Sequence, residues 1–321
     1  MKTLFNLTTD SYDLLHYKNS IELTSDLSGF DGLELMCFDP DSRGIICPEQ
    51  VIGIHMSFFA YWLDFWMGDE EALIKEFDNL ENCARHYGGS DRSALLERFQ
   101  KDLDNAIRYK AEYVVFHVSD CSTKEVFSRK FNHSHEEVIE ATCEVLNELF
   151  KNLEDGPALL LENLWYPGLD FTRPNLTKML LDGIKYKNKG IMLDTGHLLH
   201  TNPRIRTQEE GLQYINKMLE LHGNLAQNIR GIHLNQSTTG QYAIQMQENL
   251  PVFESTFTKR QWQLLSYVQQ IDQHKPFTCK GVRDLIDRIS PEYLTFEFIS
   301  KSREERFEYL QQQKNAIVYN K

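Results

Sequence analysis

The sequence lacks long hydrophobic runs, and its N-terminal apolar residues end early. Thr8, Thr9 and Asp10 interrupt them too soon for the apolar region of a signal peptide. No later run reaches the roughly 20 residues that a transmembrane helix requires. We therefore expect a cytoplasmic protein without membrane partners.

Cysteine pairs and an excess of positive charge are also missing. None of the six cysteines forms a C-x-x-C pair, which argues against a zinc ribbon or a redox dithiol. The 34 Lys and Arg residues are outnumbered by 47 Asp and Glu residues, giving a formal charge of -13. This balance excludes a broadly basic nucleic-acid-binding surface but leaves a local basic groove open.

No linker or low-complexity tract divides the 321 residues, of which 41% are hydrophobic. Short apolar segments alternate with longer segments of helical pattern along the whole chain, as in strands buried on both faces. Eight such strands are expected: Thr3–Leu7, Gly32–Phe38, Val51–Ser57, Glu112–Val118, Ala158–Leu164, Gly190–Asp194, Ile229–Leu234 and Tyr293–Phe298.

Helices are predicted between these strands, and some carry start signals. Ser134 and Glu137 have the spacing of a capping box, and Pro174 suits a first helical turn. Eight alternations without a break predict an α/β protein with a single (β/α)₈ TIM barrel over residues 1–321. The longest connection, between Leu234 and Tyr293, should hold a helix and an inserted loop region around 238–258.

Ionisable residues stand at or near the ends of these strands. In a TIM barrel the C-terminal strand ends converge on one mouth, so these residues become neighbours. A single strand histidine is more often a hydrogen-bonded core residue, but several buried carboxylates beside imidazoles require neutralisation, which a divalent metal provides. The mixture favours zinc or manganese over calcium. The residues are His55, His117, Glu162, Asp194, His197, His233, Asp272, His274 and Glu297.

Four short segments in strand order resemble motifs of a known superfamily. They read Leu161-Glu162-Asn163, Leu193-Asp194-Thr195-Gly196-His197, Gly231-Ile232-His233-Leu234-Asn235 and Phe296-Glu297-Phe298. This set is similar to the xylose isomerase-like TIM barrel superfamily, which includes endonuclease IV, the apurinic/apyrimidinic endonuclease 2 family, and many sugar isomerases and epimerases. The resemblance covers nearly the whole chain.

The resemblance implies two alternative ligand sets. The endonuclease IV pattern implies three zinc ions: one on His55, His117 and Glu162, one on Glu162, Asp194, His233 and Glu297, and one on His197, Asp272 and His274. The epimerase pattern implies one ion on Glu162, Asp194, His233 and Glu297. Gln236, Ser119 and Gln273 depart from the endonuclease pattern at neighbouring positions and spare the ligands.

Each ligand set predicts its own chemistry. With three ions we expect a phosphoesterase in which a metal-activated hydroxide attacks phosphorus, Glu162 bridges two ions and Glu297 orients the nucleophile. With one ion we expect a sugar or sugar-phosphate isomerase or epimerase, in which Glu162 and Glu297 act as acid and base and His197 contacts substrate. A non-catalytic binding barrel would have little use for so many ionisable groups. Expected partners are a small phosphorylated or sugar substrate, or abasic DNA.

Residues on the rim leave several interpretations open. The aromatic segment Phe58–Trp66, like Trp165 and Tyr166, suits stacking on a ligand, a lid, or plain packing. Arg204 and Arg206 follow the sixth strand and are placed to pair with a phosphate. The cluster of Lys185, Lys187 and Lys189 precedes that strand and belongs to the opposite, solvated face. The sequence leaves the substrate, the oligomeric state and the native metal open.

Overall fold

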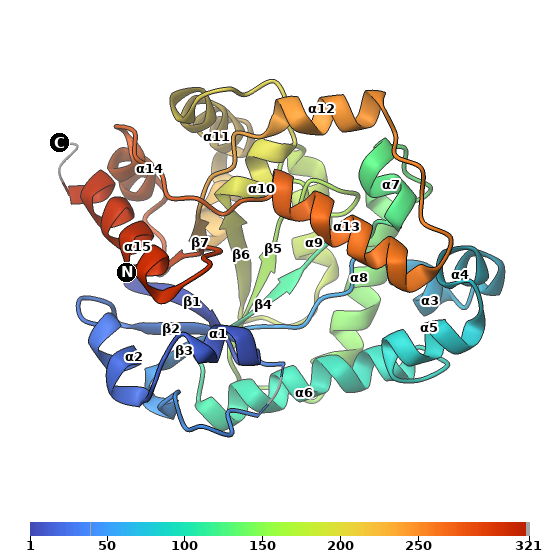
Figure 1. Ribbon diagram of the computed structural model, residues 1–321, viewed down its shortest axis with the longest axis horizontal. Coiled ribbons are helices and arrows are strands. Elements are labelled where there is room, and N and C mark those ends of the chain that lie inside the picture. Colours follow the sequence, from blue (N-terminus) through green and yellow to red (C-terminus); the bar gives the residue numbers. More distant parts are fainter. Residues whose placement is uncertain (39, 319–321) are drawn as a thin grey trace.

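Eight parallel strands, paired in chain order, close into a barrel in the computed structural model, which describes residues 1–38 and 40–318 (Figure 1). Strand β8 pairs with β1 and completes the ring. This arrangement confirms the single (β/α)₈ TIM barrel. The strands are β1 (Lys2–Thr8), β2 (Gly32–Met36), β3 (Val51–His55), β4 (Tyr113–His117), β5 (Ala158–Glu162), β6 (Lys189–Asp194), β7 (Ile229–Leu234) and β8 (Tyr293–Phe296).

Helices surround this barrel and occupy the connections between its strands (Figure 1). The predicted capping box is confirmed, because Ser134 and Glu137 exchange hydrogen bonds at the start of α8. The helices are α1 (Ser11–Leu15), α2 (Ser20–Asp26), η1 (Pro48–Gln50), α3 (Leu63–Met67), α4 (Glu70–Phe77), α5 (Leu80–Tyr87), α6 (Ser93–Tyr109), α7 (Thr123–Ser128), α8 (His135–Leu149), α9 (Pro174–Gly183), α10 (Thr195–His200), α11 (Gln208–His222), η2 (Gly223–Asn228), α12 (Gly240–Glu248), α13 (Phe257–Ile271), α14 (Val282–Ile289) and α15 (Arg303–Val318). Within the described ranges, no helix is both long and apolar enough to cross a bilayer.

The alternation of side chains along each strand sets which residues reach the mouth. In β5, Leu159 and Leu161 pack outward against the helices, whereas Leu160 joins the cluster inside the barrel. Because side chains alternate between faces, Glu162 also points inward, one layer nearer the C-terminal end. In β6, Met192 also lies in the interior cluster, so Asp194, two residues later, points inward as well. The packed interior thus forms a floor beneath the ionisable residues.

The connection between β7 and β8 folds back over the mouth. Its helices α12 and α13 pack against each other and against α7, on the side toward which the arrows of β4 and β5 point (Figure 1). Backbone hydrogen bonds in both directions between Gln236 and Lys275 tie the residues after α13 to the end of β7. The segment 238–258 contains α12 and a stretch that leads into α13.

Most of the aromatic segment Phe58–Trp66 packs inside the protein. The ring nitrogen of Trp62 donates to the Ser119 carbonyl over 2.8 Å, and the ring nitrogen of Trp66 donates to Glu144 over 3.0 Å. Both rings are buried, whereas Phe58 is 51% exposed. The segment therefore serves mainly as packing, and Phe58 is its most exposed aromatic residue.

A glycine-to-alanine substitution in β3 tests the packing of the barrel interior around Tyr113. A Cβ atom added at Gly53 would lie 2.2 Å from the ring of Tyr113, whose hydroxyl donates to Glu34 over 2.6 Å. We expect Gly53→Ala to lower the free energy of unfolding by about 1–3 kcal/mol, because the buried ring must shift. Urea denaturation measures this loss.

The matched control is Gly211→Ala in α11. Its added Cβ would lie 3.2 Å from the Leu199 methyl groups, a smaller conflict. Alanine also improves helix propensity by about 1 kcal/mol, so we expect little net change. Equal stability of the two variants would contradict the close fit of Gly53 against Tyr113.

Candidate metal centre

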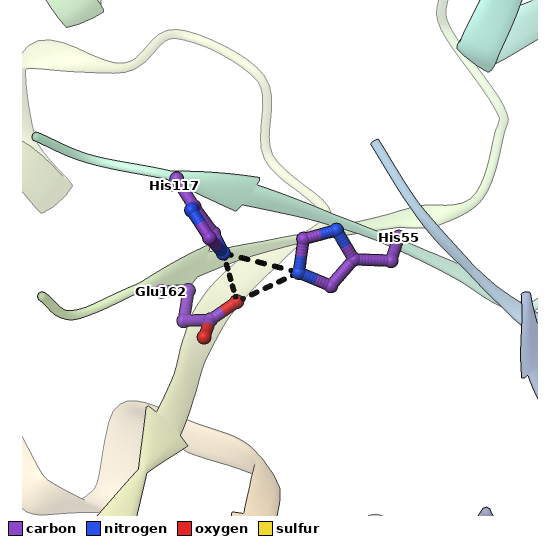
Figure 2. A group of neighbouring side chains, drawn as sticks. All are labelled: His55, His117 and Glu162. Atoms are coloured by element: carbon purple, nitrogen blue, oxygen red, sulfur yellow. Dashed lines mark hydrogen bonds and ion pairs between the residues drawn. The ribbon is translucent and has the colours of Figure 1, made fainter. Parts of the chain in front are cut away.

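His55, His117 and Glu162 converge at the ends of β3, β4 and β5. Figure 2 shows both imidazole rings and the carboxylate pointing toward one another. The His55 and His117 Nε2 atoms lie 3.2 and 3.1 Å from Glu162 Oε2, and 3.1 Å from each other. Glu162 is fully buried, so these groups meet away from bulk solvent.

A second group surrounds the other oxygen of Glu162. His233 Nδ1 lies 3.3 Å from Glu162 Oε1, 3.3 Å from Glu297 Oε2 and 4.0 Å from Asp194 Oδ2. Asn235 donates its amide hydrogens to Asp194 over 2.7 Å and to Glu297 over 3.3 Å, which orients both carboxylates. Glu162 therefore belongs to both groups.

The third group joins helix α10 to the loop after α13. His197 Nε2 lies 3.4 Å from Asp272 Oδ2, and His274 Nε2 lies 2.9 Å from the same oxygen. His274 adopts a left-handed backbone conformation with φ of 45°, which turns its ring toward Asp272 and Glu297. The chain reaches this position through the pairing of Gln236 with Lys275.

The turn from β6 into α10 positions Asp194 and His197 together. Asp194 caps the helix by accepting a 2.5 Å hydrogen bond from the His197 backbone N–H. Gly196 lies between them, and a Cβ atom there would stand 1.9 Å from the Asn235 side-chain oxygen. Only glycine fits this close approach, which explains the Asp-Thr-Gly-His sequence.

All nine residues singled out in the sequence therefore lie at one mouth. Their ligand atoms form four overlapping groups, within each of which the atoms lie within 4.8 Å of one another: His55–His117–Glu162, Glu162–Asp194–His233–Glu297, His197–Asp272–His274, and His55–His233–Glu297, which joins the first two. The first three groups coincide with the ligand sets that the resemblance implies. Metal binding by them stays a prediction.

Hydrogen bonds to three of the imidazole rings decide which nitrogen faces the centre. His55 Nδ1 donates to the Met56 carbonyl over 2.9 Å, and His197 Nδ1 donates to the Asn163 carbonyl over 3.0 Å. A carbonyl can only accept, so in the neutral rings the Nε2 lone pairs point at the carboxylates. His233 has the reverse orientation, because its Nε2 faces the Glu34 carboxylate.

These lone pairs and carboxylate oxygens form a suitable environment for a bound cation. Within the described residues the two oxygens of Glu162, His233 Nδ1 and Asp272 Oδ1 make no well-formed hydrogen bond, although groups of the opposite kind face them at 3.1–3.4 Å. Buried acceptors facing one another are costly unless a positive charge joins them. The donor set of imidazole and carboxylate groups fits zinc or a similar divalent ion.

The sequence of the chain assigns it to a known protein family. A family model described as "Xylose isomerase-like TIM barrel" matches residues 21–289. The chain belongs to this family. No curated protein matches its sequence.

Several solved structures share the barrel fold of this protein. They include a protein from Rhodospirillum rubrum described as a "Putative Xylose isomerase" (TM-score 0.55, 12% identity, 98% of this chain and 99% of that one). Others are 3-keto-D-glucoside 4-epimerase YcjR from E. coli (0.53, 11%, 99% and 98%) and the IolI protein, solved with a bound zinc atom (0.52, 13%, 100% and 99%). At these identities the similarity shows the fold alone.

The charges at the mouth shift one another's protonation. Burial alone would raise the pKa of Glu162, but His117 and His233 hold it well below its ordinary value. Burial raises the pKa of Glu297 to about 7, and the carboxylates of Asp194 and Glu162 add to this shift. The two glutamates therefore differ in proton affinity although they share one site.

Glu34 and His200 also belong to the centre, although neither was among the residues predicted from the sequence. The two Glu34 oxygens lie 2.8 and 3.0 Å from His233 Nε2, and Tyr113 and Thr295 donate to the same carboxylate. Such a carboxylate fixes the ring that faces a metal. In the sequence, Glu34 could have been recognised as a charged residue at an inward-facing position of the second strand.

His200 contacts the third group from behind. Its Nε2 lies 3.4 Å from Asp272 Oδ1, the oxygen opposite the one that faces His197 and His274. Trp165 packs over it at 4.6 Å between ring centroids. The signal was the His-x-x-His spacing, which places His197 and His200 on the same face of α10.

The rim residues take different positions from one another. Phe58 stacks on His117 with ring centroids 4.6 Å apart, directly beside the centre. Arg206 directs its Nη1 nitrogen at the carbonyls of Pro203 and Ile205, so less of its guanidinium is available for the predicted phosphate contact. Lys185 is exposed before β6, as predicted for the opposite face.

The metal-free protein should lose stability as the pH rises. Burial lowers the pKa of His274, but Asp272 and Glu297 outweigh this and raise it to about 9. The ion pairing of protonated His274 therefore stabilises the fold fully below pH 6.5 and is lost between pH 6.5 and about 9. We expect a loss of up to about 3 kcal/mol over that range, measured by urea unfolding of chelator-treated protein.

Two variants separate this contribution from other titrations. His274→Gln should flatten the alkaline loss of stability. His222→Gln should retain it, because burial lowers the pKa of His222 and any loss from that residue occurs as the pH falls. Stability of the metal-free wild type that does not change between pH 6.5 and 9 would contradict the paired charges at His274.

Proposed function

We propose that this member of the xylose isomerase-like TIM barrel family is a divalent-metal-dependent phosphoesterase resembling endonuclease IV. The observation that carries the proposal is the third group. In a one-metal sugar enzyme His197 would contact substrate, whereas here its Nε2 faces Asp272 and His274 and the residue is only 4% exposed. A buried Asp with two facing histidines is a ligand set for a further ion.

Three ions would be held by the three groups described above, with Glu162 shared by two of them. We propose zinc as the native metal and manganese as the alternative, because imidazole and carboxylate ligands suit both. Bound ions would supply a hydroxide nucleophile near neutral pH and neutralise charge on the phosphoryl oxygens.

The protein's own residues prepare this chemistry by fixed orientation. Asn235 holds Asp194 and Glu297, and Glu34 holds His233, so little rearrangement is needed. The most exposed side chains of the centre are His117 at 12% and Glu297 at 11%, which marks the side where substrate enters. Glu297 thus stands between the buried ligands and an incoming phosphoester, where it can orient a water molecule.

A small phosphate ester fits this chain better than abasic duplex DNA. The formal charge of -13 opposes a DNA polyanion. Two arginines near the mouth are partly engaged with backbone, Arg206 as described and Arg129 with the His200 carbonyl. Duplex DNA needs a row of free cations along its backbone, whereas a small ester needs only a local contact.

The second candidate is a sugar or sugar-phosphate isomerase or epimerase with one metal. The opposite pKa shifts of Glu162 and Glu297 in the metal-free protein favour it, since an acid and base pair needs two carboxylates of different proton affinity. Both carboxylates lie 3.3 Å from His233 Nδ1, so the two groups line the same site.

Metal content separates the two candidates. Elemental analysis of protein purified without chelator should find close to three ions per chain. We expect His55→Ala and His274→Ala each to remove about one ion, because each deletes a ligand of a different group. One tightly bound ion that survives both substitutions would refute the three-metal proposal.

His222→Ala is the matched control for these variants. His222 is also a buried histidine, but it bonds to Thr177 and to the Met218 carbonyl and stacks on Phe171 instead of facing a carboxylate of the centre. The control should keep the full metal content even if it lowers stability. Its thermal unfolding shows how much stability the loss of a buried imidazole removes by itself.

Reaction assays test the chemistry directly. We expect hydrolysis of p-nitrophenyl phosphate esters that falls at least about 100-fold in Asp272→Ala, because the third ion loses its carboxylate. Nicking of an abasic-site duplex tests DNA as substrate. Incorporation of solvent deuterium into ketoses, unchanged in Asp272→Ala and without any ester hydrolysis, would favour the epimerase instead.

A further inference from the structure

A separate cavity of about 440 Å³ lies on the mouth side of the barrel, beside the metal centre. Its walls come from the residues after β2 and β3 and from helices α5 and α6. Ser57 and Phe58, which follow His55 in the chain, form the wall nearest the ligands. Phe58 stacks on His117, so one ring separates the cavity from a predicted metal ligand.

The charge of this cavity is opposite to that of the protein. Arg85, Arg98 and Lys101 line it, against the single lining carboxylate of Glu97, and Arg85 is already paired with Glu81 over 2.8 Å. By contrast, a larger cavity of about 660 Å³ near α4 and α7 has more carboxylates than cationic side chains in its lining and favours no anion. In a chain with a formal charge of -13, a local cationic cavity beside the centre selects for anions.

Arg98 is held in a fixed orientation inside this cavity. Its Nε and Nη2 nitrogens donate to Ser57 Oγ over 3.0 and 2.6 Å, and Nη2 also approaches the Cys37 carbonyl at 3.4 Å. Ser57 is held in turn by the buried carboxylate of Asp102. Nη1 donates to no group within the described residues, so a ligand oxygen can take it up without reordering the side chain.

The remaining walls are aromatic and apolar. Phe58 is 51% exposed, and Phe59 packs on Tyr87 with ring centroids 5.1 Å apart. Lys101 is exposed on α6 one helical turn from Arg98 and makes no hydrogen bond or ion pair with any described residue. The cavity thus offers two cationic groups for an anion and a flat surface for the carbon skeleton that carries it.

We propose that this cavity binds an anionic group of the substrate, a phosphate or a carboxylate remote from the reacting ester. The substrate class is then a small phosphate ester with a second anionic group, bound between Arg98 and the metal centre with Phe58 beneath its skeleton. The proposal rests on the proposed function for the identity of the reacting group but not for the anion site.

Calorimetric titration of the metal-loaded protein tests the site with three probes of the same ring. Phenylphosphonate, which has no ester bond to hydrolyse, carries a phosphate-like dianion, benzoate carries a carboxylate, and benzyl alcohol carries no charge. We expect the anions to bind more tightly than the alcohol, and the tighter anion identifies the natural group. Arg98→Gln and Lys101→Gln should each weaken anion binding, roughly tenfold for Arg98, because a charge-assisted hydrogen bond is lost.

Two further variants make the result decisive. Arg283→Gln removes an exposed arginine of α14 that pairs with Asp287, and it should leave anion binding unchanged. Asp272→Ala disrupts the third metal group and should also leave binding at the cavity in place. Lys101→Gln keeps the test valid if Arg98→Gln fails to fold, since Lys101 has no structural partner.

The results that would contradict the anion site differ from those that would contradict the phosphoesterase activity. Anion binding that persists in both Arg98→Gln and Lys101→Gln but disappears in Asp272→Ala would show that phosphate binds only at the metals. Equal affinity for benzyl alcohol, or no binding of either anion, would also overturn the proposal. Anion binding at the cavity without any ester hydrolysis would leave the site standing and remove the phosphoesterase.

Discussion

The rest of the structure depends on the compensation of charge in a buried barrel mouth. Five carboxylates and six imidazoles meet above the apolar residues of the barrel interior. Removing one member of a buried pair leaves the charge of its partner uncompensated. The carboxylates are Glu34, Glu162, Asp194, Asp272 and Glu297. This mutual dependence explains why Asn163, Asn235 and backbone carbonyls orient the ionisable groups so closely.

Strand parity allowed much of this centre to be predicted from the sequence. The interior position of Glu162 and Asp194 follows from the alternation that buries Leu160 and Met192, so a barrel prediction already places these carboxylates at the mouth. The groups that hold the ligands were harder to find. Glu34 acts across the barrel on His233, almost 200 residues later, and no local pattern encodes that contact.

The helices beyond β3 show a second limit of sequence reasoning. Helices α3, α4 and α5 are short, and the two tryptophan rings at α3 bond to Ser119 after β4 and to Glu144 of α8. Their apolar periodicity is therefore too brief to separate a helix from an aromatic loop. The cavity beside Arg98 lies between one of these short helices, α5, and α6, and it depends on tertiary packing.

The hydrogen-bonded pairing of Gln236 with Lys275 gives the third group a structural independence that the barrel residues lack. Asp272 and His274 arrive on a returning segment attached to the rim, whereas the other ligands stand on or directly after strands. Such a segment can diverge without disturbing the closed sheet. In a barrel of this kind, a change in the one segment that crosses the mouth can therefore alter the third group of ligands while the closed sheet stays the same.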